Sequence, residues 1–471
     1  MDSVRKDHCS AFEYKRATTP FLDSLDGLRF EKAYSNGTYT ATSLPSMLTS
    51  RYPLENGHVV YNDWPSLPEY LADTEYSTCV AFNNIQIKRF EYANEFDQIF
   101  DFSQPEKEVD NKEDFEASES MSDNSILERA KNHVVNRITK SKRARAFLQD
   151  VQFRFGSTVI EPPHPGDETV TDKVVSWLED APEPYFLWVH YMDTHHPYEF
   201  KISKFKSIST YEFDSSRYSR LLARARHHIQ SGDYIWELSE GERQYIIDAY
   251  DASLLHLDQQ IKRLFEVVDS TETTALITSD HGEELWDRGH FGHASRPSKP
   301  RSMTLYEEMV RVPLIMTGPD VPTNTIDDPV SLVDILPTVL SVAGSDIPDN
   351  VRGSPLDEFY RGAVSPDHES VIAHATIPGD PGAYLKENSS YMGMIREEEM
   401  KMIYSQTNSD ELYDLTTDPR EQKDLIDQKT NVASELRKRL QATIQERSSE
   451  TTETTTDKQV QHQLRELGYL E

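Results

Sequence analysis

Cysteine is nearly absent from this chain, and so are long apolar runs. Among 471 residues only Cys9 and Cys79 occur, so no disulfide framework is expected and neither thiol needs to be reactive. There is no uninterrupted stretch of about 18 apolar residues, so no membrane-spanning helix is predicted, and no signal peptide precedes the first motif. The residues as written therefore predict a cytoplasmic protein without a membrane segment.

Basic residues are scarce relative to acidic ones. Lys and Arg number 49 against 81 Asp and Glu, which gives a formal net charge of -32. Such a charge repels nucleic acid and anionic lipid, so neither is expected as a partner. Because strong negative charge also keeps proteins soluble in high salt, the composition suggests a halophilic source. Aromatic residues make up 10% of the chain, which argues against general disorder.

An apolar run, Ala275–Ile277, is predicted to be a strand that ends in a tight polar turn. Asp280 and His281 stand side by side in this turn. In open α/β sheets the carboxyl ends of strands face the ligand crevice, so this pair can hold a divalent cation and leave a position for substrate. His290 and His293 follow in Gly-His-Phe-Gly-His. Taken alone, the pattern also fits a turn cap followed by surface histidines.

Serine and threonine are concentrated in residues 38–53, where a loop is predicted to lead into a short helix. A hydroxyl at a helix N-terminus suits a nucleophile, because the unpaired N–H groups there stabilise an anionic ester. Ordinary helix capping explains one such hydroxyl but not the whole segment. Thr40 and Ser43 are the candidate nucleophiles.

A second buried strand is predicted over Tyr185–Val189, and polar residues gather where it ends. His190 is interpreted as a core histidine of this strand. His196 is either a spare neighbour or, with Asp193, a ligand of a second metal ion, and the second ion is not expected.

Several short segments, in this order along the chain, resemble the sulfatase branch of the alkaline phosphatase superfamily, which includes arylsulfatases and phosphonate monoester hydrolases. No single segment is decisive, whereas the ordered set is specific. The matching segments are residues 279–283, 305–308, 311–315, 334–338, 411–415, 418–421 and 467–470.

The resemblance implies an α/β fold with a mixed, mostly parallel sheet between helices and a smaller C-terminal α+β domain that carries an antiparallel sheet. A catalytic domain is expected over 1–365, with insertions at about 103–150 and 203–240. The smaller domain is expected over 366–471, with a flexible linker at 448–457. Periodicity predicts a long helix over 243–268, short strands over 371–376, 391–396 and 400–404, and a helix over about 430–447.

The opening residues resemble the end of the family's first central strand, which makes Asp2 a metal ligand. In the family an apolar stretch precedes this aspartate, and here it is missing. The first strand is therefore expected to be truncated, and a longer form that carries a signal or an anchor remains an alternative. Arg5 is expected to contact the substrate or to hold the metal carboxylates, and a structural salt bridge is the alternative.

The resemblance further implies one divalent ion, bound by Asp2, Asp280, His281 and the Thr40 hydroxyl. The nitrogen ligand favours manganese or zinc, with calcium or magnesium as alternatives. His195 and His293 are the expected catalytic histidines, which hydrogen-bond the ester or protonate its leaving oxygen.

Two registers compete for the nucleophile. The segment from 48 to 53 resembles the family's stretch after the nucleophile and selects Thr40, whereas the local string from 43 to 46 selects Ser43. Sulfatases proper use a formylglycine, to which threonine cannot be converted. Thr40 therefore favours a phosphodiester or phosphonate ester, and Ser43 favours a classical sulfate ester.

The residues of the family's sulfate grip are replaced here by a stretch that ends in Asn83 and Asn84. These two residues and His290 are expected to contact the substrate, a small-molecule, glycan or lipid ester. The alternative outside the enzymes is a non-catalytic binding or scaffold protein that keeps the fold.

Overall fold

The structure, a computed structural model, describes residues 1–53, 64–103, 165–231, 237–293, 304–361, 370–376, 391–406 and 409–450. Nearly all of the expected insertion at 103–150, and the expected linker from residue 451 onward, lie outside these residues. Among the described residues, no helix combines the length and the apolar character that a membrane crossing requires.

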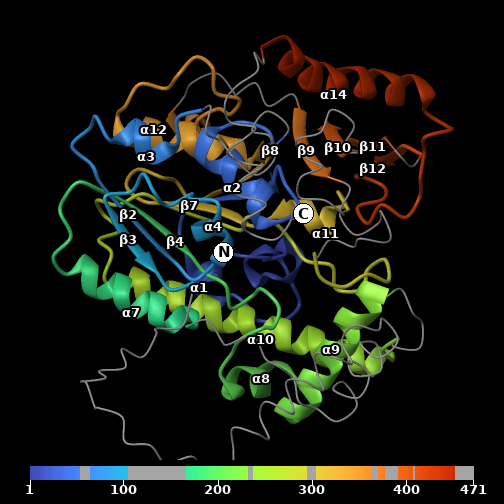
Figure 1. Cartoon of the computed structure of the whole chain (residues 1–471), viewed down its shortest axis with the longest axis horizontal. Coiled ribbons are helices and arrows are strands. Elements are labelled where there is room, and N and C mark those ends of the chain that lie inside the picture. The colour runs from blue at the N-terminus through green and yellow to red at the C-terminus, as the bar shows by residue number, and fades with distance from the viewer. Residues whose placement is uncertain are drawn as a thin grey trace, which may run out of the picture.

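The larger part of the molecule contains two sheets (Figure 1). One has the order β3 (Gln98–Asp101), β2 (Ser77–Phe82), β4 (Tyr185–His190), and all of its pairs are parallel. The other has the order β5 (Ala275–Thr278), β7 (Leu314–Thr317), β1 (Leu28–Tyr34), β6 (Arg311–Val312) in antiparallel pairs. In addition, β8 (Asn324–Ser331) pairs with β1 in parallel. Parallel and antiparallel pairs both occur between helices, as predicted, but they are divided between two sheets.

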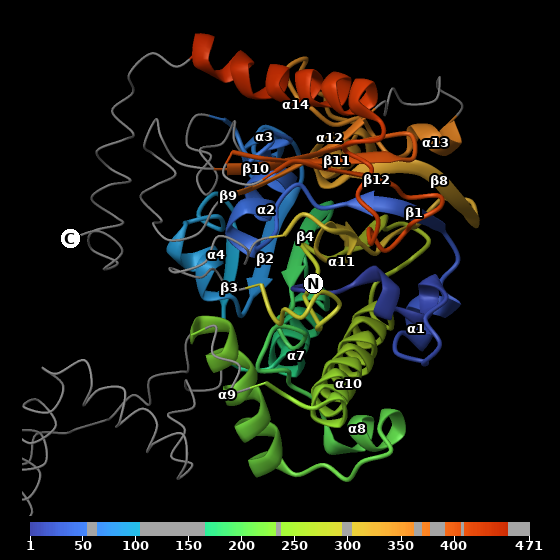
Figure 2. The same ribbon diagram turned by 90° about the vertical axis from the view of Figure 1, so that its right-hand side faces the viewer.

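Helices cover both faces of these sheets (Figure 2). Apolar side chains of α2 (Thr40–Thr49), α3 (Leu67–Leu71) and α12 (Ile335–Ala343) form one core with β2. Those of α1 (Pro20–Ser24), α7 (Asp167–Leu178) and α10 (Glu240–Phe265) form a core on the other side, with Ala81, Ile277 and Ile315. The long helix predicted over 243–268 is therefore confirmed as α10, and its apolar stripe faces the sheet.

The expected insertion at 203–240 forms α8 (Ile202–Ile208) and α9 (Ser215–Ser231). Both helices pack on the N-terminal half of α10 through aromatic side chains that include Phe205, Tyr218 and Tyr245. The remaining short helices are α4 (Ile85–Arg89), α11 (Glu307–Val310) and α13 (Glu358–Arg361).

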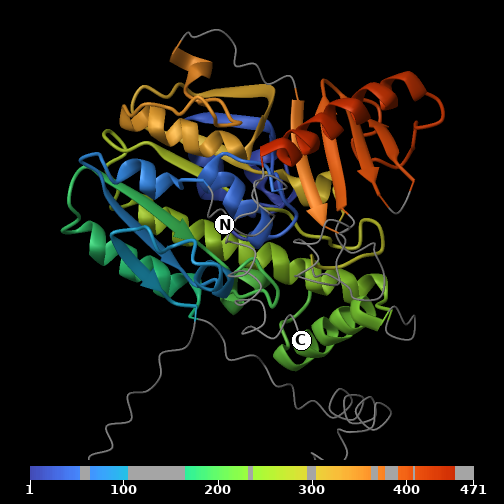
Figure 3. The same ribbon diagram turned by 45° about the horizontal axis from the view of Figure 1, so that its top comes forward.

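The C-terminal part holds a separate antiparallel sheet (Figure 3). Its order is β12 (Glu411–Asp414), β11 (Met400–Ser405), β10 (Tyr391–Glu397), β9 (Ser370–Thr376). Helix α14 (Thr430–Glu450) covers one face, where Leu436 and Leu440 pack with Ile395 and Met402. The predicted smaller antiparallel sheet and its helix are confirmed.

The two sheets of the larger part do not pair with each other; the first two residues lie between them. The Asp2 amide donates to the Tyr191 carbonyl just beyond β4 at 2.9 Å, and the Asp280 amide donates to the Met1 carbonyl at 3.0 Å. The Met1 amino group donates to the Thr278 carbonyl at the end of β5, also at 3.0 Å. Asp2 is thereby fixed between the carboxyl ends of β4 and β5.

Behind this junction lies a cavity of about 1160 Å³ between β4 and β5. Apolar side chains from both faces of the sheets line much of it, among them Leu44, Trp188, Leu276 and Val339. Two polar residues next to Asp2, His190 and Asp280, also line this cavity.

Candidate active site

The Asp2 carboxylate collects polar groups from three elements. Its Oδ2 accepts from the Thr40 hydroxyl at 3.0 Å and from the Asn84 amide at 2.9 Å, and it lies 3.3 Å from His190 Nε2. Thr40 is the first residue of α2, and Asn84 caps α4. The Asn84 amide nitrogen is also 3.5 Å from the Thr40 hydroxyl oxygen. The structure therefore brings the expected nucleophile and the expected first ligand into direct contact.

Asp280 and His281 approach the same carboxylate from the turn after β5. His281 Nε2 lies 3.7 Å from Asp2 Oδ1 and 3.7 Å from Asp280 Oδ2. The other ring nitrogen of His281 lies 2.7 Å from the Gly282 carbonyl oxygen, which fixes the ring and leaves Nε2 for a ligand. Gly282 itself is required here, because a Cβ would lie 2.0 Å from the Glu308 carbonyl oxygen.

Two atoms of this cluster are buried without a hydrogen-bond partner among the described residues, namely Asp280 Oδ2 and His281 Nε2. Buried polar atoms rarely lack a hydrogen-bond partner, so these two atoms indicate that a ligand binds between them. Carboxylate oxygens, a hydroxyl and an imidazole nitrogen are donors that divalent cations accept. The residues present thus fit the expected metal ion, which Asp2, Asp280, His281 and Thr40 would hold.

The electrostatics of the cluster also favour a cation. Burial would raise the pKa of the Asp2 carboxyl, but the hydrogen bond with His190 and the nearby imidazoles of His195 and His281 hold it well below its usual value. Burial opposes the charged form of His281, yet Asp280 and Asp2 raise the pKa of its imidazole. The anionic side chains therefore stabilise any positive charge placed between them.

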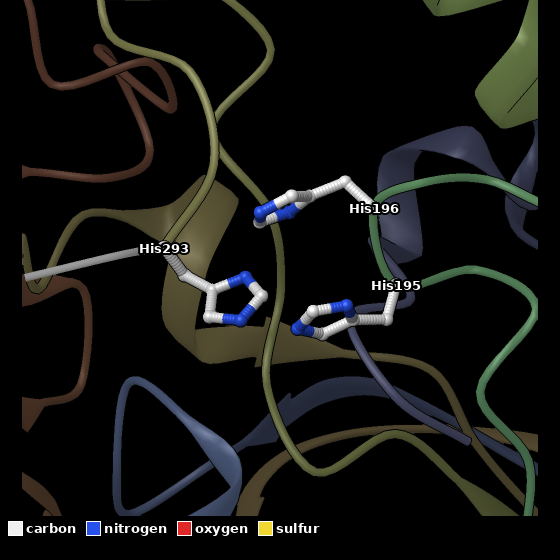
Figure 4. Close-up of side chains that lie close together, drawn as sticks. All are labelled: His195, His196 and His293. Carbon is white, nitrogen blue, oxygen red and sulfur yellow. The ribbon is translucent and has the colours of Figure 1, made fainter. Parts of the chain in front are cut away.

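Three further histidines converge beside this cluster (Figure 4). The rings of His195 and His196 stack with centroids 4.7 Å apart, and His293 lies across His195 at 4.8 Å. The ring of His293 is also 4.5 Å from that of His281. Burial lowers the pKa of His195 to about 4, with His293 also opposing its charged form, so His195 is neutral near pH 7. The two expected catalytic histidines are thus side by side and next to the ligand cluster.

Ser43 points away from Asp2. Its hydroxyl donates to the Asp280 backbone carbonyl at 2.5 Å and lies 2.9 Å from the Ser35 hydroxyl. Of the two candidate nucleophiles, Thr40 is the one whose oxygen contacts the Asp2 carboxylate.

The structure does not bring Asn83 or Arg5 to the cluster. The Asn83 amide donates to the Pro165 carbonyl and to Asp167, at 3.0 and 3.1 Å. The Arg5 guanidinium donates to the carboxylates of Asp7 and Asp287 and to the Glu283 carbonyl. Arg5 therefore forms the structural salt bridge that the sequence left as the alternative to substrate binding.

His290 is likewise outside the convergent group. It lies in the turn before Phe291, where its carbonyl accepts from the Trp286 amide at 2.7 Å. Within the described part of the chain, it does not belong to the sets of ligand atoms that approach within 4.8 Å of one another.

Two residues of the cluster have contacts that sequence reasoning did not foresee. His190 is buried, as expected of a core histidine, but its Nε2 faces Asp2 and Asn84. Its place as the last residue of a parallel strand was the available signal. Glu283, two residues after His281, lies under the other histidines with its Oε2 3.1 Å from His293 Nδ1 and 3.7 Å from His196 Nδ1.

Comparison with known proteins identifies the family of this chain. The family profile "Sulfatase" matches residues 1–345, and "N-sulphoglucosamine sulphohydrolase, C-terminal" matches residues 301–449. The "Uncharacterized sulfatase YidJ" of Escherichia coli is 23% identical over 457 residues, covering 90% of this chain and 82% of that protein.

Solved structures share the fold at low sequence identity. The phosphonate monoester hydrolase of Agrobacterium radiobacter superposes with a TM-score of 0.67 at 18% identity, covering 95% of this chain and 94% of its own. BT4656, solved with its substrate D-glucosamine-2-N,6-O-disulfate, gives a TM-score of 0.61 at 18% identity, covering 95% and 97%. With a family profile matched over most of its length, this chain belongs to the sulfatase family of the alkaline phosphatase superfamily and is an ester hydrolase.

Proposed function

We propose that the chain is a metal-dependent hydrolase of phosphodiesters or phosphonate esters that uses the Thr40 hydroxyl as its nucleophile. The observation that carries this proposal is the 3.0 Å hydrogen bond from Thr40 Oγ1 to Asp2 Oδ2, at the first residue of α2. A threonine cannot become formylglycine, so a hydroxyl in this place acts on phosphorus through its own oxygen.

The surroundings of Thr40 suit this role. Asp2 accepts the hydroxyl hydrogen and holds Oγ1 in place for attack; its low pKa suits this positioning role, and the hydroxyl proton passes to bulk water when the hydroxyl ionises. The N-terminus of α2 offers unpaired amide groups to the anionic ester. The Asn84 side-chain amide, 3.5 Å from the hydroxyl oxygen, can donate to a phosphoryl oxygen.

Asp2, Asp280, His281 and Thr40 would hold one divalent ion, manganese or zinc by preference because His281 supplies nitrogen. When bound, such an ion lowers the pKa of the hydroxyl and offsets the charge that develops on the ester, effects worth several kcal/mol. The two buried atoms without partners, Asp280 Oδ2 and His281 Nε2, support this ligand set.

Two histidines act on the leaving group of the ester. His195 is neutral near pH 7 and therefore acts as a hydrogen-bond partner of the ester more than as a strong acid. His293, whose Nδ1 contacts Glu283, is placed to deliver the proton to the departing oxygen. The P–O bond to the leaving alcohol breaks as the alcohol takes this proton. Water then returns a proton to His293 as it attacks phosphorus, and the bond from phosphorus to Thr40 Oγ1 breaks, which restores the Thr40 oxygen.

The test compares three matched substrates, namely an aryl sulfate, an aryl phosphate monoester and a bis-aryl phosphodiester. Each is incubated with manganese or zinc and with wild type, Thr40→Ala or Ser43→Ala. We expect phosphodiester turnover that falls at least about a thousandfold in Thr40→Ala, as for loss of a catalytic nucleophile. Ser43→Ala is the matched control and should keep most of the activity.

Two results would redirect the assignment. Sulfate turnover that is lost in Ser43→Ala would identify a formylglycine-type sulfatase. No turnover of any of the three esters, together with no bound divalent ion, would favour a binding or scaffold protein of this fold. Screening of glycan and lipid esters would then identify the organic part of the natural ester.

A further inference from the structure

Glu283 and His293 lie opposite each other across the turn that follows β5. Within this turn Leu285 and Phe291 form an antiparallel bridge. Moving outward by two residues on each side of the bridge gives Glu283 on one segment and His293 on the other. Because side chains two residues apart on an extended segment point to the same face, this register sets the carboxylate of one against the imidazole of the other.

The backbone of Glu283 is held on both sides. Its amide donates to the Glu308 carbonyl at 3.2 Å, and its carbonyl accepts from the Arg5 guanidinium, also at 3.2 Å. Arg5 is itself held by two carboxylates, and the Glu283 side chain is fully buried. The carboxylate therefore meets the histidine from a fixed position, as a group that orients another side chain requires.

The contact between the two side chains decides which ring nitrogen carries a hydrogen. Glu283 Oε2 lies 3.1 Å from His293 Nδ1, whereas His196 Nδ1, at 3.7 Å from the same oxygen, is beyond hydrogen-bond distance. A carboxylate that is ionised near neutral pH has only acceptors, so His293 Nδ1 is the donor. This leaves Nε2 as the nitrogen of His293 that takes up and releases a transferred proton.

The orientation of His293 matters because its ring lies beside the Asp2 cluster. The ring centroid is 4.5 Å from that of His281 and 4.8 Å from that of His195 (Figure 4). One of its ring nitrogens lies within 4.8 Å of an Asp2 carboxylate oxygen. A half turn of the ring about its χ2 angle would exchange Nε2 with a carbon atom, and the hydrogen bond to Glu283 opposes that turn.

We propose that Glu283 is a positioning residue for His293. Its carboxylate accepts Nδ1–H and thereby directs Nε2 at the leaving oxygen of the ester. The proton passes from Nε2 to this oxygen as the P–O bond breaks, while Glu283 keeps its hydrogen bond and transfers no proton. The inference rests on the proposed function, in which His293 protonates the leaving oxygen, and adds to it the group that orients the acid.

The experiment compares two phenylphosphonate monoesters that differ only in their leaving group, 4-nitrophenol or phenol. 4-Nitrophenol departs readily as an anion, whereas phenol depends more strongly on receiving a proton. Glu283→Met keeps the length of the side chain and removes the acceptor. We expect kcat/KM of this variant to fall about 100-fold for the phenyl ester and less than about tenfold for the 4-nitrophenyl ester.

Glu284→Met is the matched control. Glu284 is the next residue along the chain and is also buried, but its carboxylate accepts from the Thr304 hydroxyl at 2.8 Å. The control should change kcat/KM for the two esters by the same factor. Equal losses for the two esters in Glu283→Met as well would show a structural role and overturn the inference.

A double variant separates orientation from an independent contribution. His293→Gln should favour the 4-nitrophenyl ester in the same way as Glu283→Met, with a loss at least as large. The double variant should be no slower than His293→Gln alone, because a residue that acts only through His293 has no effect once that ring is absent. Losses that multiply in the double variant would overturn the inference.

Nitrogen-15 NMR of histidine-labelled protein tests the contact without turnover. The signals of His293 are identified by their loss in His293→Gln. We expect a hydrogen on Nδ1 in the wild type and a redistribution of that hydrogen toward Nε2 in Glu283→Met. An Nδ1 without hydrogen in the wild type would overturn the inference whether or not the variants fold. A hydrogen on Nδ1, together with equal losses for the two esters in His293→Gln, would contradict the acid in the proposed function and the inference with it.

Discussion

Two buried ionic clusters in this molecule differ in how completely their charges are paired. Around Lys401, between the larger part and the C-terminal sheet, the ammonium lies 2.8 Å from Glu307 and 2.8 Å from Glu421. Glu307 also accepts from the Tyr34 hydroxyl at 3.0 Å. Around Asp2, by contrast, acidic groups face histidines and each other, and Asp280 Oδ2 and His281 Nε2 are buried without partners in the described structure.

The comparison separates a structural from a functional use of buried charge. The Lys401 cluster is closed, because Glu421 and Glu307 also pair with the guanidinium groups of Arg288 and Arg311, at 3.3 and 3.6 Å, and such a cluster joins elements. The Asp2 cluster is open, because its negative charge exceeds what the protein supplies, and such a cluster binds ligands. Removal of a charge should therefore destabilise the Lys401 cluster and stabilise the metal-free Asp2 cluster.

The largest expected effect is in the closed cluster. Lys401→Met removes the fully buried ammonium that Glu307 and Glu421 share and should lower the free energy of unfolding by about 3–5 kcal/mol. Lys429→Met is the control, because Lys429 is 41% exposed and 3.6 Å from Asp414, so it should change stability by less than about 1 kcal/mol. Urea denaturation measures both, and equal effects would mean that the closed cluster does not stabilise the fold.

In metal-free protein, removing a charge from the Asp2 cluster should raise the free energy of unfolding. Asp280→Asn keeps the shape of the side chain and removes an uncompensated buried charge, so metal-free protein should become more stable by about 1–3 kcal/mol. With metal present the same change should be destabilising, because a bound ion stabilises the native state. Thermal unfolding with and without chelator checks the reversal of sign; a loss of stability in both conditions would contradict the open-cluster interpretation.

The smallest expected effect on stability comes from a buried histidine that lies outside both clusters. His374 on β9 has no hydrogen-bond partner for either ring nitrogen in the described residues, and burial lowers its pKa to about 3. The unfolded chain takes up this proton near pH 6.5, so stability falls as pH drops below that value and continues to fall toward pH 3. The loss should reach about 1 kcal/mol by pH 5.5.

His374→Leu removes the titrating group and should flatten the acid side of the pH–stability profile. The profile is measured by urea denaturation between pH 5 and 8 in wild type and variant. Parallel profiles in the two proteins would show that other groups control acid sensitivity.

Much of the fold could be read from the sequence because its signals are local. The apolar run before Asp280, the spacing of α10 and the alternation of the C-terminal strands each report a burial pattern that depends on neighbouring residues only. The nearness of Asp2, Thr40, Asp280 and His281 followed from the ordered resemblance to a family.

What could not be read depends on the direction of single side chains. Arg5 and Asp2 are three residues apart, yet one faces Asp7 and Asp287 while the other faces Thr40. Asn83 and Asn84 are adjacent and point to different partners. The role of Glu283 needs two loops, after β4 and after β5, to be brought together, and no local pattern encodes that meeting.

The apolar cavity between β4 and β5 is a place where the two sheets of the larger part could be joined. Among the described residues both strands have a free edge there, and residues 1 and 2 connect only their polar ends. An extended segment of about six apolar residues in this cavity would run beside the six residues of β4 and give each edge a partner. Ordering the backbone of one residue costs about 1–2 kcal/mol. A segment that already orders the backbone around Asp2 would remove this cost from cation binding, so cation affinity and rigidity would rise together.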